Sequence, residues 1–182
     1  MIGIIGAMEE EVAALKSEMA DAKVTEFASM TFYKGTLCGK DTVVVRSGIG
    51  KVNAAICAQI LVDKFGVDTL INTGIAGSLD ARIDIGDMVI STDAVHHDMD
   101  ATILGDAIGQ VPRMDTRTFP ADPHLVELAV KANEKANPQI HTFTGRVASG
   151  DQFISSGEVK AHIVENFQAL CTEMEGAGIA HA

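Results

Sequence analysis

Short apolar segments that end in glycine-containing turns recur along this chain of 182 residues and alternate with helical patterns. Ile2–Ile5 ends at Gly6, Thr69–Asn72 precedes the turn at 73–77, and Thr142–Ala148 precedes Ser149-Gly150-Asp151. Apolar strands that alternate with helices are typical of α/β proteins, in which the strands form a largely buried sheet. No linker or repeat interrupts the pattern, so we predict a single α/β domain over residues 1–182.

The spacing of apolar residues predicts helices between these strands. One face of a first helix repeats at i, i+4, i+7 and i+11: Met8, Val12, Leu15 and Met19. Lys51–Phe65 has few polar residues and is expected to be a largely buried helix that ends at Gly66. Asp122 and Pro123 have the residue types of a helix start. The apolar stripe expected to follow them is Leu125, Leu128, Ala129 and Ala132. The remaining elements are a hairpin of 31–37 with 42–45, strands at 87–94 and 169–172, and helices at 158–166 and 175–182.

Composition excludes several classes of partner. Lys and Arg number 14 against 25 Asp and Glu, which gives a formal charge of −11. An acidic chain repels nucleic acid and anionic membranes, and only 4% of residues are aromatic. No apolar run approaches the ~20 residues of a membrane span. Because Met1–Gly6 lacks a basic region and is predicted to be a strand, we expect a cytoplasmic protein.

The cysteine and histidine patterns do not favour a metal or redox site. Cys38, Cys57 and Cys171 lie far apart with no C-x-x-C spacing, so we expect buried free thiols. His96-His97-Asp98 with Asp100 supplies metal-ligand residue types, but adjacent side chains of an extended segment point to opposite sides. We therefore predict no metal and no cofactor.

Ligands of α/β proteins bind beyond the carboxyl ends of the strands. The five loops at such positions are Gly6–Glu11, Ser47–Gly50, Thr73–Gly77, Ser149–Ile154 and Glu173–Glu175. Gly3-x-x-Gly6 does not match the dinucleotide fingerprint, and Gly50-Lys51 is followed by Val52 where a P-loop needs Ser or Thr. The Ser47–Gly50 turn can still bring backbone close to a ligand.

Two of these loops carry carboxylates. In Glu9-Glu10-Glu11, the helical wheel places Glu10 opposite the apolar face and leaves the choice between Glu9 and Glu11 open. Glu173-Met174-Glu175 follows an apolar run and precedes a segment of small residues. A polar pocket flanked by two acidic motifs suits hydrolysis through an oxocarbenium-like state, in which one carboxylate activates water and another binds sugar hydroxyls.

Six motifs, in order along the whole chain, resemble those of the 5′-methylthioadenosine/S-adenosylhomocysteine nucleosidases. They are Gly3–Glu11, Ser47–Ala55, Ile71–Gly77, His97-Asp98 with Gly109–Pro112, Ser149–Ile154 and Glu173–Gly176. The resemblance implies a nucleoside phosphorylase-like three-layer fold with a central mixed sheet flanked by helices. It also implies hydrolysis of the N-glycosidic bond, which releases adenine and a 5-thioribose in methionine salvage.

The resemblance also implies roles for matching residues. Glu11 is expected to activate the attacking water, and Glu175 to bind the ribose hydroxyls with Met174 against the sugar. The residues expected to hold adenine are Phe153, the Ile154 backbone and Gly77, which lines the same pocket. Met8 and Ile49 are expected on the ribose and thioalkyl side. A partner subunit completes the thioalkyl pocket in relatives through the segment at 101–108, which implies a homodimer.

The sequence departs from the family pattern in two places. The aromatic residues usual in the family between His97 and Gly109 are replaced by Asp100-Ala101-Thr102-Ile103-Leu104-Gly105-Asp106. The family continues with a strand ending in Ser-Asp, whose Asp protonates adenine N7, whereas this sequence ends at Ala182. We therefore expect a chain that is C-terminally incomplete relative to the family and a poor catalyst.

Three other functions remain open at this point. A nucleoside phosphorylase of the same fold needs arginines for phosphate, and the only nearby one is Arg46, which is expected to face away at a strand end. An aminodeoxyfutalosine nucleosidase shares nearly the same motifs. A non-catalytic purine-binding fragment is the third alternative.

Overall fold

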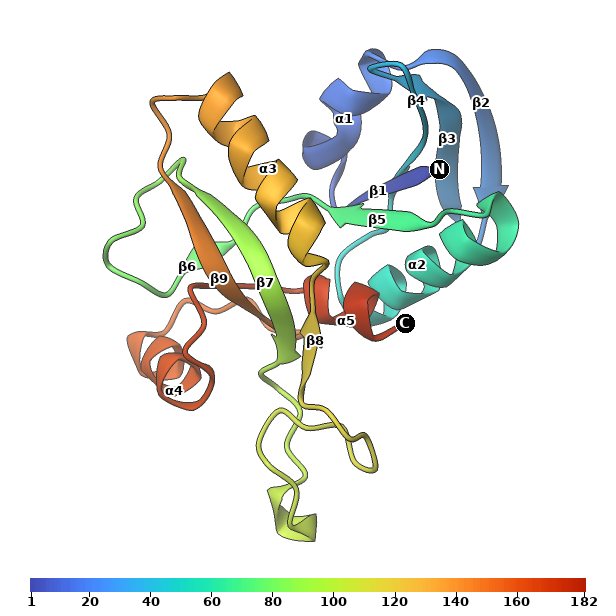
Figure 1. The fold of residues 1–182 in the computed structure, drawn as a ribbon. Helices are drawn as coiled ribbons and strands as arrows, with labels where there is room; N and C mark the ends of the chain where they lie inside the picture. The colour runs from blue at the N-terminus through green and yellow to red at the C-terminus, as the bar shows by residue number, and fades with distance from the viewer. The chain divides into compact units, whose positions relative to one another are not determined.

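The computed structural model describes residues 1–182, and the chain divides into two compact units. The first unit comprises Met1–Ile75 with His181–Ala182, and the second comprises Ala76–Ala180. Each unit contains one five-stranded mixed sheet with helices packed on it (Figure 1). This architecture confirms the predicted α/β fold class, with the strands distributed over two sheets.

The sheet of the first unit has the order β2-β3-β4-β1-β5. Its strands are β1 (Ile2–Gly6), β2 (Ala20–Phe27), β3 (Met30–Leu37), β4 (Lys40–Arg46) and β5 (Thr69–Asn72). Strand β1 lies between β4 and β5 and runs parallel to both, so that the carboxyl ends of these three strands share one edge. The loops that follow them are three of the five predicted as ligand-binding loops.

Two helices cover the sheet of the first unit. In α1 (Glu9–Ser17), Val12 packs with Leu37 and Val44 of the sheet, and the predicted face residues Leu15 and Met19 join this cluster. In α2 (Lys51–Phe65), Leu61 lies close to Gly3 of β1, where an added Cβ would come within 3.1 Å of the Leu61 Cδ1 atom. Helix α2 has the predicted bounds and ends at Gly66 in the left-handed conformation.

The sheet of the second unit has the order β6-β10-β9-β7-β8. Its strands are β6 (Gly77–Ser78), β7 (Met88–His96), β8 (Thr118–Pro120), β9 (Thr142–Ser149) and β10 (Cys171–Glu173). Strands β7, β9 and β10 are parallel, and β6 and β8 are antiparallel edge strands. The carboxyl ends of β9 and β10 therefore bring the loops that start at Ser149 and Glu173 together.

Three helices complete the second unit: α3 (Pro123–Ala136), α4 (Gly157–Phe167) and α5 (Gly176–His181, whose last residue is assigned to the first unit). The Asp122 carboxylate accepts hydrogen bonds from the backbone of His124 and Leu125, as expected of an N-cap. Phe167 at the end of α4 is fully buried with Val95 and Ala148 of the sheet. Between β7 and β8 the chain forms a long loop that contains only a short 3₁₀ turn, Thr102–Leu104 (Figure 1).

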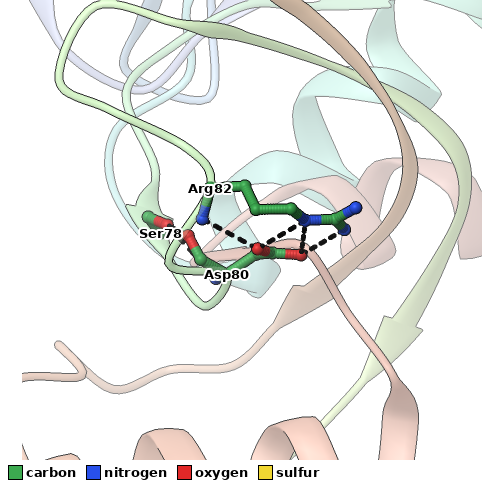
Figure 2. Close-up of polar contacts among 3 residues, drawn as sticks. All are labelled: Ser78, Asp80 and Arg82. Carbon is green, nitrogen blue, oxygen red and sulfur yellow. Dashed lines mark hydrogen bonds and ion pairs between the residues drawn. The ribbon is translucent and has the colours of Figure 1, made fainter.

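An ion pair closes the turn that follows β6. Figure 2 shows the Arg82 side chain along the Asp80 carboxylate, with Nη2 2.5 Å from Oδ2 and Nε 3.0 Å from Oδ1. The Ser78 hydroxyl donates to the Asp80 carbonyl at 2.8 Å. The hydrogen bonds from Arg82 lower the pKa of Asp80 to about 2.

This pKa predicts how the turn responds to acid. Because the folded pKa lies below the ordinary value of 3.8, the contact stabilises the turn above that pH and is lost as the pH falls through about 2. An NMR titration of the Asp80 carboxyl carbon should give a midpoint near 2, and Arg82→Gln should return the midpoint toward 3.8. A wild-type midpoint near 3.8 would contradict the ion pair in solution.

Three expectations about burial are wrong. Helix α2 buries only one face, and Val52, Ile56 and Val62 on the other are exposed. In α3 the expected stripe is not the buried face, since Leu128 is 48% exposed and the buried residue is Asn133, whose amide donates to Thr142 Oγ1 at 2.9 Å. Cys38 is exposed because it lies in the turn between β3 and β4, at a φ of 49°.

The other two thiols are buried as predicted. Burial raises the pKa of Cys57 to about 12, and burial with the charge of Glu173 raises the pKa of Cys171 to about 12. Both therefore stay protonated and unreactive near neutral pH. No helix of the protein is both long and apolar enough to cross a bilayer.

Candidate active site

The Glu11 carboxylate is held by three backbone N–H groups of the first unit. Its Oε2 accepts from Ala7 N at 2.7 Å and Met8 N at 2.9 Å, and its Oε1 accepts from Ile75 N at 3.0 Å. Ala7 and Met8 follow β1, whereas Ile75 follows β5, so the parallel pairing of these strands creates the cradle. The three donors hold the carboxylate in one position between the two loops.

Gly74 completes the cradle around Glu11. A Cβ at this position would lie 2.5 Å from Glu11 Oε1 and 2.9 Å from its Cδ atom. Any larger residue would therefore push the carboxylate away from the Ile75 N–H. The close approach of the Glu11 carboxylate thus explains why the 73–77 turn has a glycine at position 74.

The two neighbouring carboxylates have different surroundings. Glu9 forms an ion pair with Lys16, whose Nζ lies 2.9 Å from Glu9 Oε2. Glu10 is exposed and makes no side-chain hydrogen bond or ion pair. The surroundings therefore distinguish Glu9 from Glu11, which the helical wheel could not do. Only Glu11 is held by backbone donors from two loops.

A hollow of about 530 Å³ opens beside this loop in the first unit. Met8 and Ile49, both predicted to contact substrate, line it, and Ile49 is 53% exposed. The other lining residues come from the start of α1, from the β2–β3 turn, from the end of β4 and the loop after it, and from α2: Ala7, Glu9, Glu10, Ala28, Ser29, Met30, Arg46, Ser47, Gly48 and Asn53. Arg46 thus lines the hollow, contrary to the expectation that it faces away.

In the second unit a hydrogen-bonded pair fixes the loop that carries Glu175. The fully buried Ser149 hydroxyl donates to Glu173 Oε1 and accepts from Ala177 N at 2.7 Å. Glu173 Oε2 accepts from the backbone of Glu175 at 2.9 Å and Gly176 at 2.7 Å. Glu173 therefore caps the start of α5 and sets the backbone conformation at Glu175.

The predicted substrate residues of the second unit differ in exposure. Glu175 is only 8% exposed, Met174 is half-buried, and Gly77 of β6 is exposed beside Thr172. Phe153 is 88% exposed in a segment without regular structure. Ile154 packs against the buried cluster around Phe167, which fixes the backbone next to the free aromatic ring.

The histidine segment forms part of the same region. His97 is buried, and its backbone N–H donates to Ser149 O at 2.9 Å. The Asp98 carboxylate accepts from Asp151 N at 2.9 Å, and the His96 ring packs edge-to-face on Phe119. No group of three His, Cys, Asp or Glu side chains is placed to hold a metal ion.

Close packing at Gly150 predicts the effect of a larger residue there. A Cβ at this position would lie 2.4 Å from His97 Nε2, so Gly150→Ala must displace a buried ring and should lower the free energy of unfolding by about 1–3 kcal/mol. Denaturant unfolding measures this loss. If the clash is the cause, Gly150→Ala should cost much less in a His97→Ala background, and an equal loss in both backgrounds would contradict it.

Comparison with known proteins places the chain in a family. The model of the phosphorylase superfamily matches residues 1–182. A 5′-methylthioadenosine/S-adenosylhomocysteine nucleosidase of Staphylococcus saprophyticus is 46% identical over 182 residues, which cover 99% of this chain and 78% of that protein. The chain belongs to the 5′-methylthioadenosine/S-adenosylhomocysteine nucleosidase family. This membership confirms the resemblance found in the sequence motifs.

Solved structures of this nucleosidase family have the same fold. The enzyme from Colwellia psychrerythraea, in complex with adenine, has a TM-score of 0.94 and 46% identity, over 99% of this chain and 74% of that one. A futalosine hydrolase of Helicobacter pylori has a TM-score of 0.92 and 32% identity, over 99% and 76% of the two chains. The fold is therefore common to nucleosidases with different named substrates.

Three features of this nucleosidase family member were missed in the sequence. The cap formed by Ser149 and Glu173 joins residues that are 24 positions apart, although both lie in predicted site loops. Ile75 N is 64 positions from Glu11, and backbone donors leave no trace in residue type. The sequence-based expectation treats Arg46 only as a possible phosphate ligand. Its position directly before the predicted Ser47–Gly50 site loop is the signal that indicates a place in the hollow.

Proposed function

We propose that this protein hydrolyses the N-glycosidic bond of 5′-methylthioadenosine and S-adenosylhomocysteine and releases adenine. The observation that carries the proposal is the Glu11 carboxylate, held by three backbone N–H groups in a member of a nucleosidase family. A carboxylate offers about four lone-pair sites, so three donors leave one for a water molecule. Glu11 then accepts one proton of that water as its oxygen bonds to the anomeric carbon. The bond between this carbon and adenine N9 breaks at the same time, and the departing adenine takes up a proton from solvent.

The next proposed roles belong to residues of the second unit. Glu175 accepts hydrogen bonds from the ribose hydroxyls, and Met174 lies against the sugar. The carboxylate binds the electron-poor, oxocarbenium-like ribose more tightly than the ground state, which lowers the barrier. The preformed cap by Glu173 supports this role, because it fixes the Glu175 backbone before substrate binds.

Different residues contact the adenine end and the thioalkyl end of the proposed substrate. Phe153 stacks on the base, the Ile154 backbone hydrogen-bonds to it, and Gly77 lines the pocket. The exposure of the Phe153 ring supports this role, since a free aromatic face is available for stacking. Met8 and Ile49 contact the ribose and the thioalkyl group, which agrees with their place in the hollow of the first unit.

The remaining parts of the proposal concern the domain organisation, the oligomeric state, the cellular location and the pathway. We propose that residues 1–182 act as one nucleosidase domain, that the protein forms a homodimer through the segment at 101–108, and that it works in the cytoplasm in methionine salvage. The exposed side chains of Ile103 and Leu104 at the tip of that segment support the homodimer. Size-exclusion chromatography with light scattering tests it, and a single species of 19.2 kDa at all concentrations would contradict it.

A substrate panel in phosphate-free buffer tests the activity. With protein in excess, so that the slow turnover expected of a poor catalyst is detected, adenine release should be seen from 5′-methylthioadenosine and S-adenosylhomocysteine. It should be faster from both than from 6-amino-6-deoxyfutalosine. The futalosine hydrolase of Helicobacter pylori makes the third substrate the relevant comparison. Faster release from aminodeoxyfutalosine would transfer the proposal to that substrate, and no release from any of them would overturn it.

A second candidate function is phosphorolysis. It is favoured by one observation: Arg46, a residue type that binds phosphate, lines the hollow together with Met8 and Ile49. If the protein is a phosphorylase, adenine release requires added phosphate. We propose hydrolysis because Glu11 is placed to activate water, and phosphate-independent release would support it.

A further inference from the structure

Two free charges of opposite sign line the hollow of the first unit. Arg46 lies at the end of β4, and Glu10 lies in the first turn of α1. Both side chains are exposed, and neither makes an ion pair or a side-chain hydrogen bond. Glu9 also lines the hollow, but its carboxylate already forms an ion pair with Lys16 at 2.9 Å. It is therefore less available than Glu10 to bind a charged group of a ligand.

The same hollow holds the two apolar residues proposed for the thioalkyl end of the substrate. Met8 is half-buried and Ile49 is exposed, so both present an apolar surface to a ligand in the hollow. The two charges and the two apolar residues line one and the same hollow. The arrangement is therefore amphipathic, with apolar contacts for sulfur and carbon and charges for a polar group attached to them.

The two proposed substrates differ at this end of the molecule. 5′-Methylthioadenosine carries only a methyl group on sulfur. S-Adenosylhomocysteine carries an amino-acid tail with an α-carboxylate and an α-ammonium group. A guanidinium binds a carboxylate through two parallel N–H donors, and a carboxylate binds an ammonium group by charge and hydrogen bonding.

We propose that Arg46 binds the α-carboxylate and Glu10 the α-ammonium group of S-adenosylhomocysteine, and that this pair sets its preference over 5′-methylthioadenosine. The inference rests on the proposed function and adds two specificity-determining residues to it. Since the charges are solvent-accessible, salt screens the interaction. Removing Arg46 should reduce the preference about 2- to 5-fold, the range expected of a solvent-exposed ion pair.

The test compares kcat/KM for the two substrates in the intact protein. Arg46→Gln should lower the ratio of S-adenosylhomocysteine to 5′-methylthioadenosine about 2- to 5-fold. Glu10→Gln should lower it less, and Arg46→Lys should retain part of the preference. Lys23→Gln is the matched control, because it removes the same charge from an exposed position of β2 outside the hollow. Thermal melting of each variant shows that the fold is retained.

A decarboxylated analogue of S-adenosylhomocysteine identifies the group that Arg46 recognises. If Arg46 binds the carboxylate, the Arg46→Gln variant and the wild type should have equal kcat/KM for this analogue. If Arg46→Gln changes kcat/KM equally for all three substrates, or changes it for none, the inference is overturned. Adenine release by the wild type would still support the proposed function in that case. An Arg46 effect seen only with added phosphate would assign the oxyanion site to inorganic phosphate instead. Failure of the wild type to cleave 5′-methylthioadenosine would count against the proposed function itself.

Discussion

Replacing Glu11 by glutamine should slow adenine release from 5′-methylthioadenosine about 100- to 10,000-fold, the usual contribution of a general base. Glutamine has nearly the same shape but cannot accept the proton of the attacking water. Its amide N–H₂ would also face one of the three N–H donors that now point at the carboxylate. The variant should therefore also be less stable by about 1–3 kcal/mol. Single-turnover adenine release and denaturant unfolding measure the two effects separately.

A matched substitution shows whether the loss belongs to Glu11 alone. Glu26→Gln makes the same chemical change on β2, at an exposed position outside the hollow. It should leave both the rate and the stability unchanged. If Glu11→Gln keeps more than about a tenth of the wild-type rate, Glu11 does not act as the base, because general-base catalysis contributes at least about 100-fold.

Replacing Phe167 by alanine should lower the free energy of unfolding by about 3–5 kcal/mol. The ring is fully buried with Val95, Ala148 and Ile163, and its removal leaves a cavity. The long loop between β7 and β8 also depends on this ring. An added Cβ at Gly109 would come within 2.5 Å of its Cε1 atom, and the Arg117 guanidinium lies 5.6 Å from its centroid.

Circular dichroism during urea unfolding measures the loss, and hydrogen exchange at 108–117 reports on the loop. The matched control is Phe153→Ala, which removes the same ring from a position that is 88% exposed and should change stability by less than about 0.5 kcal/mol. The two variants should also differ in function, since the control is expected to lose adenine affinity. A loss below about 1.5 kcal/mol for Phe167→Ala would show that the ring is not packed as described.

Much of the fold could be predicted from local patterns. The bounds of α2, the N-cap at Asp122 and the strand β5 match the sequence-based expectations, because apolar spacing and capping residues act over a few positions. Strand β2 was missed because it is an edge strand with nearly every residue exposed, so it carries no apolar alternation. The buried face of α3 was missed because a hydrogen bond to Thr142 allows the polar Asn133 to be the buried residue.

The candidate site was only partly predictable for a related reason. The motifs identified the loops and the acidic residues, because those signals lie within short segments. Helical periodicity could not choose between Glu9 and Glu11, since the difference depends on Lys16 for one and on Ile75 N for the other. The place of Arg46 at a strand end led to the expectation that it faces away, but that place does not distinguish open solvent from a hollow at the end of the strand.

The most direct test of the proposed hydrolysis is the identity of the sugar product. We would incubate excess wild-type protein with 5′-methylthioadenosine in ¹⁸O-labelled water that also contains phosphate, and analyse the products by mass spectrometry. Hydrolysis with water activated by Glu11 predicts adenine and methylthioribose that carries one ¹⁸O atom at the anomeric carbon. Methylthioribose 1-phosphate, or intact substrate after prolonged incubation, would contradict it.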